Sequence, residues 1–326
     1  MPDTLIFTRR LPSSANRDFI SLFNNEASAH VLKYFYWYPN DADTNLLPQQ
    51  HRYYVFNEDV RLIQELLKAH AAATLDFTVP TTIVDLGPGE VNAFMLKVKP
   101  MLDVSPEIKS YIAIDYSLQV LVELRDALHP LENRHSLTFV CGDFQSARPC
   151  RLSVQNSAVL LLGQTIGSLP VYRQSSFPDR EFIEFLQNLR ECFPGATQFL
   201  LTLDRCLDWN EVLSCYSGEL TYNFFRRGYV SLFHSQDTCP AEVFTTEIRV
   251  DPEASCICFD LRLAKDVAIQ FWDRSITVGR DRRFTLGTSY RFSLEKAISL
   301  LRQAGFASIQ QLEFPGGHVA LLLAKR

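Results

Sequence analysis

Segments with strand and helix periodicity alternate through the middle of the chain, and this order restricts the fold more than any other feature. Apolar runs of strand length lie at residues 81–86, 111–114, 137–141, 158–162 and 198–203. Amphipathic stretches with helical spacing lie at residues 57–73, 91–98, 118–128 and 180–192. Strands that alternate with helices pair in parallel through right-handed crossovers. We therefore predict an α/β fold with a doubly wound sheet that helices cover on both faces.

Two regions do not follow this rhythm. The first 60 residues are rich in aromatic side chains and fit no strand–helix alternation. Residues 204–292 carry short segments of alternating polarity, which predict antiparallel strands at 242–250, 255–262 and 267–272. After them the chain returns to a helix at 294–304, which is followed by a predicted terminal hairpin with strands at 307–314 and 318–324.

Charge and composition exclude several classes of partner. The chain has 32 basic and 37 acidic side chains and a formal net charge of −5, with no block of one sign, so we expect no nucleic acid partner. The longest apolar runs, such as 158–162 and 319–324, are far shorter than the roughly 20 residues that cross a bilayer, so we expect no membrane partner. The first residues do not resemble a secretory signal, which predicts a cytoplasmic protein. The cysteines and histidines show neither C-x-x-C nor H-E-x-x-H spacing, so we expect no disulfide framework and no metal.

Three successive predicted strands end in residues suited to an adenosyl cofactor. Gly87 and Gly89 follow the first strand, where a backbone without Cβ atoms lets a ligand approach closely. Asp115 ends the second strand, where a carboxylate can accept hydrogen bonds from two ribose hydroxyls. Asp143 and Phe144 follow the third strand and offer a carboxylate and an aromatic face to an adenine ring.

Each of these residues alone has a simpler interpretation. The glycines are compatible with a tight turn, and the aspartates with helix caps. The run G-P-G-E-V-N also lacks the third glycine of a dinucleotide fingerprint, which argues against hydride transfer. Their occurrence at three successive strand ends predicts a pocket for S-adenosyl-L-methionine (SAM).

The segment after the fourth strand carries a resemblance to a known family. Residues 162–169, L-G-Q-T-I-G-S-L, look like the L-G-S-T-I-G-N-L segment of the histidine-specific, SAM-dependent methyltransferases, which trimethylate the α-amine of histidine in the ergothioneine pathway. Five further segments resemble segments of this family. Tyr34-Phe35-Tyr36 is similar to W-F-Y-D, and Tyr53-Tyr54 is similar to E-Y-Y-P. Cys215-Tyr216-Ser217 is similar to A-Y-D, Tyr222-Asn223-Phe224 to F-N-x-N, and residues 288–292 to N-S-Y-K-Y. The resemblance thus extends over most of the chain.

The resemblance implies a Rossmann-like methyltransferase domain, expected at residues 62–199 and 292–326. It also implies a second, discontinuous α+β substrate-binding domain, expected at residues 1–61 and 200–291, that covers the substrate. The residues that it implies for cofactor binding are Tyr36, Gly87, Gly89, Asp115, Asp143 and Phe144. Those that it implies for the acceptor pocket are Tyr53, Gly163, Thr165, Ser168, Tyr216 and Ser289. Among these, we expect Tyr53, Thr165 and Ser168 to orient the acceptor nitrogen.

Two substrate positions differ from the family pattern. Ser168 stands where the family has the asparagine that holds the amino acid head group, and Gly287 stands where it has the glutamate that binds the imidazole. A site that loses its discriminating polar partner loses its preference for the matching substrate. The lysine that follows the glycine turn in many family members also has no clear match, because Asn92 and Lys97 bracket its place.

We therefore expect a SAM-dependent N-methyltransferase that acts on a small amine or amino acid derivative other than histidine, in specialised metabolism. Two alternatives remain open at this stage. The chain could transfer the aminocarboxypropyl group of SAM, or it could be a non-catalytic relative that binds SAM.

Overall fold

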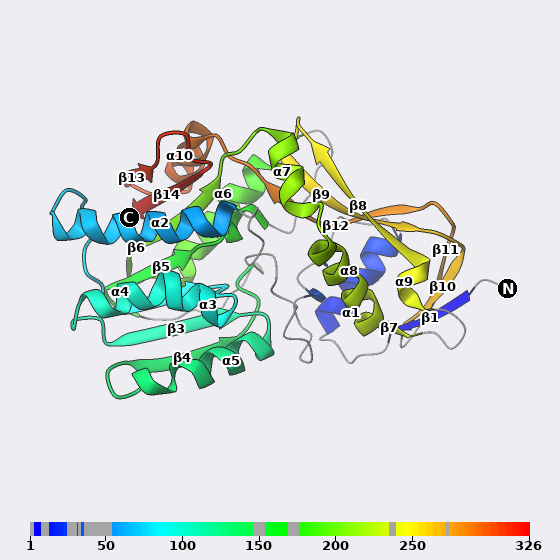
Figure 1. Ribbon diagram of the computed structural model, residues 1–326, viewed down its shortest axis with the longest axis horizontal. Helices are drawn as coiled ribbons and strands as arrows, with labels where there is room; N and C mark the ends of the chain where they lie inside the picture. Colours follow the sequence, from blue (N-terminus) through cyan, green and yellow to red (C-terminus); the bar gives the residue numbers. More distant parts are fainter. Residues whose placement is uncertain are drawn as a thin grey trace. The chain divides into compact units, whose positions relative to one another are not determined.

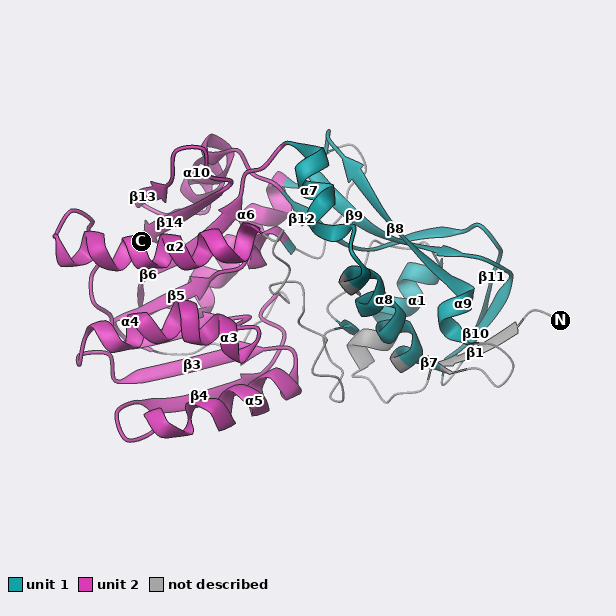
Figure 2. Cartoon of the chain, in the orientation of Figure 1, with its two compact units in different colours: residues 1–50, 168–178, 208–290 teal, residues 51–167, 179–207, 291–326 magenta. Residues whose placement is uncertain are grey.

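The computed structural model describes residues 3–7, 13–24, 31, 34–35, 54–145, 154–168, 176–234, 239–271 and 274–326 (Figure 1). The chain forms two compact units, and each unit is assembled from three separate segments (Figure 2). Unit 1 contains residues 1–50, 168–178 and 208–290, and unit 2 contains residues 51–167, 179–207 and 291–326. Within the described residues, no helix has the length and apolar character needed to cross a membrane.

Unit 2 is built on a seven-stranded sheet. Its strands are β2 (Thr82–Leu86), β3 (Ser110–Asp115), β4 (Ser136–Cys141), β5 (Ser157–Leu161), β6 (Ala196–Asp204), β13 (Ser308–Glu313) and β14 (Val319–Lys325). They lie in the order β13-β14-β6-β5-β2-β3-β4. The five strands β2, β3, β4, β5 and β6 pair with one another in parallel, whereas β14 is antiparallel to both β6 and β13. The prediction of a doubly wound, Rossmann-like sheet is therefore confirmed.

Helices pack on both faces of this sheet. Helices α2 (Tyr54–Ala71), α4 (Lys99–Val104) and α5 (Leu118–Leu128), with a π-helical segment at Phe94–Val98 that follows the short helix α3 (Val91–Ala93), share one buried cluster with the sheet. Leu62 of α2, Leu124 of α5 and Tyr111 of β3 all belong to this cluster. Helices α6 (Asp179–Cys192) and α10 (Leu294–Gln303) lie on the other face, where Phe182 and Leu301 surround an apolar space with Leu322.

The winding of the sheet reverses between β2 and β5. After β2 the chain adds β3 and β4 on one side, and it then returns to add β5 and β6 on the other. Ligands of open α/β sheets bind outside the carboxyl ends of the strands at such a reversal. The fold therefore directs attention to the residues that follow β2, β3, β4 and β5.

Unit 1 has an α+β architecture. Strands β8 (Phe244–Asp251), β9 (Cys256–Leu263) and β12 (Arg283–Tyr290) form an antiparallel sheet in the order β12-β9-β8. The first two match the predicted strands at 242–250 and 255–262, whereas β12 was not predicted and the predicted strand at 267–272 lies in the second sheet, where it pairs in parallel with residues 3–6. A second sheet has the order β11-β10-β1-β7, with strands β11 (Ser275–Val278), β10 (Val267–Gln270), β1 (Asp3–Phe7) and β7 (Phe233–His234). The helices are α1 (Ser13–Asn24), α7 (Trp209–Tyr216), α8 (Glu219–Leu232) and α9 (Pro240–Val243).

Aromatic side chains fill the interior of unit 1. Phe35 is buried against Phe225 and Tyr229 of α8, with ring centroids 6.0 and 5.4 Å away. Helix α8 contains Gly228 at this contact, and a Cβ atom there would lie 2.7 Å from the Phe35 ring. Only a glycine lets the ring of Phe35 approach the helix so closely, so Phe35 is part of this core.

Candidate functional site

The glycine turn after β2 leaves room above the sheet. Gly87 and Gly89 have φ angles of +71° and +69°, a region that glycine enters without the strain of a side chain. A Cβ atom at Gly87 would lie 3.4 Å from Cζ of Phe144 and 3.6 Å from Oγ1 of Thr165. A Cβ atom at Gly89 would meet nothing within 4 Å. The structure therefore brings Gly87, Phe144 and Thr165 together and leaves open space next to Gly89.

Asp115 connects the end of β3 to this turn. Its Oδ1 accepts a hydrogen bond of 2.7 Å from the backbone N–H of Ser117, and the backbone N–H groups of Gly89 and Tyr116 also stabilise its charged form. Burial has the larger effect and raises the pKa of Asp115 from 3.8 to about 6. At neutral pH the site thus holds a partly desolvated carboxylate that can accept further hydrogen bonds.

Asp143 and Phe144 follow β4. Oδ1 of Asp143 accepts a 3.0 Å hydrogen bond from the backbone N–H of Gln145, which fixes the carboxylate in a local turn. The Phe144 side chain is only 8% exposed, because it lies over Gly87. Of the three predicted strand ends, β2 thus carries the glycine turn, β3 carries a carboxylate beside that turn, and β4 carries a second carboxylate and the aromatic ring that lies next to Gly87.

The loop after β5 is held in an unusual conformation. Gly163 has a φ angle of +70°, and the next residue, Gln164, has a φ angle of +65° although it carries a side chain. The amide of Gln164 compensates for this conformation, since its Oε1 accepts a 2.6 Å hydrogen bond from the backbone N–H of Asp204. Thr165 follows, and its hydroxyl donates a 2.6 Å hydrogen bond to the carbonyl of Leu162. The hydrogen of the Thr165 hydroxyl is thereby engaged, and its oxygen keeps lone pairs that can accept a hydrogen bond.

A buried ion pair that the sequence analysis did not predict supports this loop. Oδ2 of Asp59, on α2, accepts a 2.6 Å hydrogen bond from the backbone N–H of Gly163 and lies 3.4 Å from Nζ of Lys97. Burial raises the pKa of Asp59, whereas Lys97 lowers it. The sequence placed Lys97 only near the position where many family members have a lysine. In the structure its Nζ lies next to Gly163. The helical spacing of α2 places Asp59 on the same face as Leu62, Ile63 and Leu66, so an acidic residue on an apolar face is the signal that could have identified it.

A second buried cluster that the sequence analysis missed surrounds Asp204 at the end of β6. Its carboxylate accepts a 2.8 Å hydrogen bond from the hydroxyl of Tyr54 and lies 2.9 Å from Nε of Arg291. Burial raises the pKa of Asp204, and it also raises the pKa of Tyr54. Because Tyr54 lies at the start of α2, this cluster ties the first turn of that helix to the carboxyl edge of the sheet.

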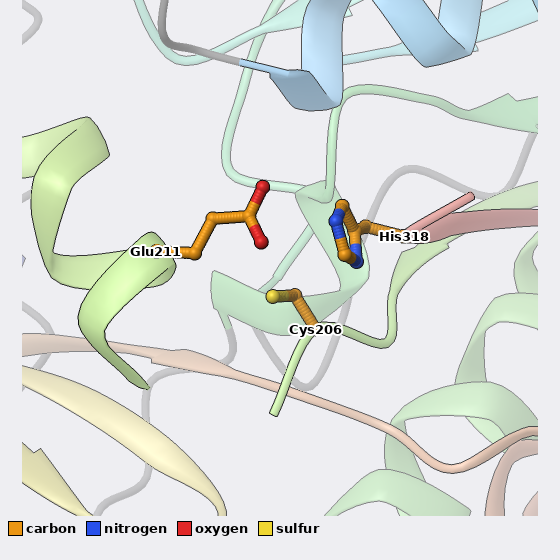
Figure 3. Close-up of side chains that lie close together, drawn as sticks. All are labelled: Cys206, Glu211 and His318. Carbon is orange, nitrogen blue, oxygen red and sulfur yellow. The ribbon is translucent and has the colours of Figure 1, made fainter. Parts of the chain in front are cut away.

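The side chains of Cys206 and His318 lie close together (Figure 3), and each contacts a member of this second cluster. The backbone N–H of Cys206 donates a 2.9 Å hydrogen bond to Asp204, and the ring of His318 packs 5.0 Å from the ring of Tyr54. The Cys206 thiol lies within 4.8 Å of a ring nitrogen of His318. Both are groups that a transition metal can bind, but the expectation of a metal-free protein stays a prediction from the sequence.

Four predicted acceptor residues lie in unit 1. Gly287 and Ser289 are neighbours on one face of β12, where they pair with Phe259 and Ile257 of β9. The ring of Tyr216, on α7, packs 5.4 Å from the ring of Phe259. The structure thus brings Tyr216, Gly287 and Ser289 to the same face of one sheet. Ser168 also belongs to unit 1, and the predicted residues Tyr36 and Tyr53 lie outside the described part of the chain, as do Leu169 and Trp272.

Comparison with known proteins identifies a family. The family model described as "Histidine-specific methyltransferase, SAM-dependent" matches residues 45–326. A search of the curated proteins found no match for this sequence.

Several solved structures show a distant similarity. The PH0226 protein from Pyrococcus horikoshii OT3 is 13% identical, with coverage of 83% of this chain and 91% of that one and a TM-score of 0.42. Magnesium protoporphyrin IX methyltransferase from Synechocystis PCC 6803, with bound SAH, is 13% identical, with coverage of 83% and 84% and a TM-score of 0.42. An amino pentose methyltransferase from Micromonospora echinaspora, with bound SAM, is 12% identical, with coverage of 82% and 91% and a TM-score of 0.40. These scores are low, and the assignment to a family rests on the sequence match.

Proposed function

The chain belongs to the family of histidine-specific, SAM-dependent methyltransferases, and we propose from this premise that it methylates a nitrogen atom of a small amine or amino acid derivative other than histidine. In this reaction the bond between sulfur and the methyl carbon of SAM breaks and a bond between nitrogen and that carbon forms. The products are the N-methylated amine, S-adenosyl-L-homocysteine (SAH) and a proton. SAM supplies an already activated methyl group, so the protein's main task is to bind and align the two reactants.

The observation that carries the proposal is the arrangement at the carboxyl edge of the unit 2 sheet. The backbone at Gly89 borders open space, and Gly87, whose φ angle of +71° favours glycine, lies next to the side chains of Phe144 and Thr165. Asp115 offers a carboxylate next to this space. In our proposal Asp115 accepts hydrogen bonds from the ribose hydroxyls, and Asp143 and Phe144 bind the adenine ring. An adenosyl group requires a backbone that it can approach closely, hydrogen-bond acceptors for its ribose and an apolar surface for its adenine ring, and these residues would supply all three.

Thr165 has the geometry of a group that orients the acceptor nitrogen. Its hydroxyl hydrogen is engaged by Leu162, so its oxygen can only accept, and an amine nitrogen carries N–H donors. The buried contact between Asp59 and Gly163 holds the loop before it. We assign Tyr53 and Ser168 the same orienting role, and Tyr216 and Ser289 the binding of a carboxylate if the acceptor has one.

Histidine is not the acceptor in this proposal, because the two positions that would select it carry Ser168 and Gly287. No strong general base is needed, since an amine that reaches the site in its neutral form has already given its proton to solvent. Methylation then requires only that its lone pair point at the methyl carbon and that water be excluded.

Product analysis tests this function. The protein is incubated with SAM and a panel of small amines and amino acids, and the adenosyl products are separated by chromatography with mass detection. Methyl transfer yields SAH together with an acceptor that has gained a methyl group. Methylthioadenosine would instead indicate transfer of the aminocarboxypropyl group, and binding of SAM without either product would indicate a non-catalytic relative. Asp115→Ala is the matched control, because it removes one proposed ribose contact and should lower SAH formation at limiting SAM.

A further inference from the structure

The two faces of the β12-β9-β8 sheet of unit 1 differ in charge. Its charged side chains share one face, where Arg249 pairs with Asp260 at 2.9 Å and Arg283 with Glu247 at 2.6 Å. Because side chains alternate along a strand, the register places the intervening residues on the other face. The residues of β8, β9 and β12 on that second face are all uncharged: Phe244, Thr246, Ile248, Val250, Ile257, Phe259, Leu261, Leu263, Phe284, Gly287 and Ser289.

The acceptor residues of the proposed function lie on this uncharged face. Gly287 and Ser289 belong to it by register, and the ring of Tyr216 packs against the Phe259 ring of the same face. Phe259 is also the register partner of Gly287. Since Gly287 has no side chain, the ring of Phe259 is the side chain that borders this position on β9. Phe225 of α8 packs 5.9 Å from that ring and restricts how far it can move.

We propose that Phe259 is a specificity-determining residue that selects an acceptor with an uncharged apolar or aromatic side chain. The inference rests on the proposed function, because it assumes that Tyr216, Gly287 and Ser289 bind the acceptor. A charged substituent placed against Phe259 would lose its hydration without gaining a partner, since no charged side chain of these three strands lies on the same face. An apolar or aromatic substituent would gain contact with the ring instead.

The test compares two sets of acceptors with the same protein. The apolar set is L-phenylalanine, L-tryptophan, L-leucine and phenethylamine, and the charged or polar set is L-lysine, L-glutamate, L-histidine and putrescine. We expect kcat/KM for SAH formation to be at least about a hundredfold higher for the best apolar acceptor than for any member of the other set. Both sets include compounds with and without a carboxylate, so the comparison isolates the side chain.

Variants then assign the selection to Phe259. Phe259→Leu should lower kcat/KM for the aromatic acceptors about tenfold, mainly through KM, and should leave the affinity for SAH unchanged. Phe284→Leu is the matched control, because Phe284 is a buried phenylalanine of the same face that pairs with Leu261 and not with Phe259. We expect the kinetics of this control to equal those of the wild type. If Phe259→Leu does not fold, Phe259→Tyr keeps the ring and should lower turnover of apolar acceptors through its buried hydroxyl.

The outcomes separate this inference from the proposed function. A wild-type protein that binds SAH but uses the charged or polar set as well as the apolar set, or that methylates no apolar acceptor, contradicts the role of Phe259. Equal effects of Phe259→Leu and Phe284→Leu contradict it as well. A wild-type protein that does not bind SAH, or that forms no N-methylated product with any acceptor, contradicts the proposed function itself.

Discussion

Nζ of Lys97 lies 3.4 Å from Oδ2 of Asp59 in the interior of unit 2, where the two side chains are 8% and 0% exposed. The same carboxylate oxygen accepts the N–H of Gly163. The ion pair therefore joins three elements, α2, the π-helical segment and the loop after β5. Its position explains how the loop that carries Thr165 keeps a left-handed backbone at Gly163.

Removal of the cation from this pair should destabilise the protein strongly. Lys97→Met leaves the Asp59 carboxylate buried without its counter-charge, and the loss of one partner of a buried pair costs about 3 to 5 kcal/mol. Lys68→Met is the control, because Lys68 and Glu65 form an exposed pair with 71% and 38% exposed side chains, which is worth less than about 1 kcal/mol. Urea unfolding followed by circular dichroism measures both. Equal losses in the two variants would show that the buried pair contributes no more than a surface pair.

The two glycines of the turn should be needed for cofactor binding beyond their effect on stability. Gly87→Ala, Gly89→Ala and Gly316→Ala all place a Cβ atom at a positive φ angle, which costs about 1 to 2 kcal/mol. Gly316, with a φ angle of +72° and open surroundings, lies in the terminal hairpin and serves as the control. We expect similar losses of stability for Gly89→Ala and Gly316→Ala in thermal unfolding, but weaker SAH binding only for Gly87→Ala and Gly89→Ala. Unchanged affinity in both turn variants would separate the turn from the cofactor.

The affinity for SAH should depend on pH through Asp115. Burial raises the pKa of this carboxyl to about 6 in the free protein. Hydrogen bonds from ribose hydroxyls favour the charged form, so binding lowers this pKa and releases a proton. The affinity should thus be constant above pH 7 and fall about tenfold by pH 5, because the protonated carboxyl must first lose its proton. Titration calorimetry at several pH values measures this slope.

Asp115→Asn is the control for this pH dependence, and its affinity should vary little between pH 5 and 7. Asp85, whose pKa burial also raises to about 6, is present in both proteins. A slope that persists in Asp115→Asn would therefore belong to another group and would contradict the assignment.

The parallel sheet of unit 2 could be predicted because the pattern that indicates each of its strands lies within that strand's own residues. Each of β2 to β6 is an apolar run of strand length, and α5 begins and ends where its apolar spacing does. Helices α7 and α8 were not predicted. Gly228 lies inside α8 and lowers its helix propensity, and the contact with Phe35 that requires this glycine is visible only after folding.

The supporting groups of the site could not be predicted for a related reason. Asp59, Lys97, Asp204 and Arg291 come from four distant segments, and no local pattern shows that Asp59 pairs with Lys97 or Asp204 with Arg291. Burial and pairing give them their role, and both depend on tertiary packing. By contrast, Gly87, Asp115 and Asp143 were recognisable because a strand end is a local feature and the parallel sheet brings such ends to one edge.

The most direct test of the central claim, that this edge of unit 2 binds SAM, is calorimetric titration of SAH into the wild-type protein and into Asp115→Ala. We predict a single site in the wild type and an affinity about 10- to 150-fold lower in the variant, because hydrogen bonds to a charged group contribute about 1.5 to 3 kcal/mol. Circular dichroism spectra that match between the two proteins ensure that the loss is local. Equal affinities would contradict the role of Asp115, and a wild-type protein that does not bind SAH would contradict the claim as a whole.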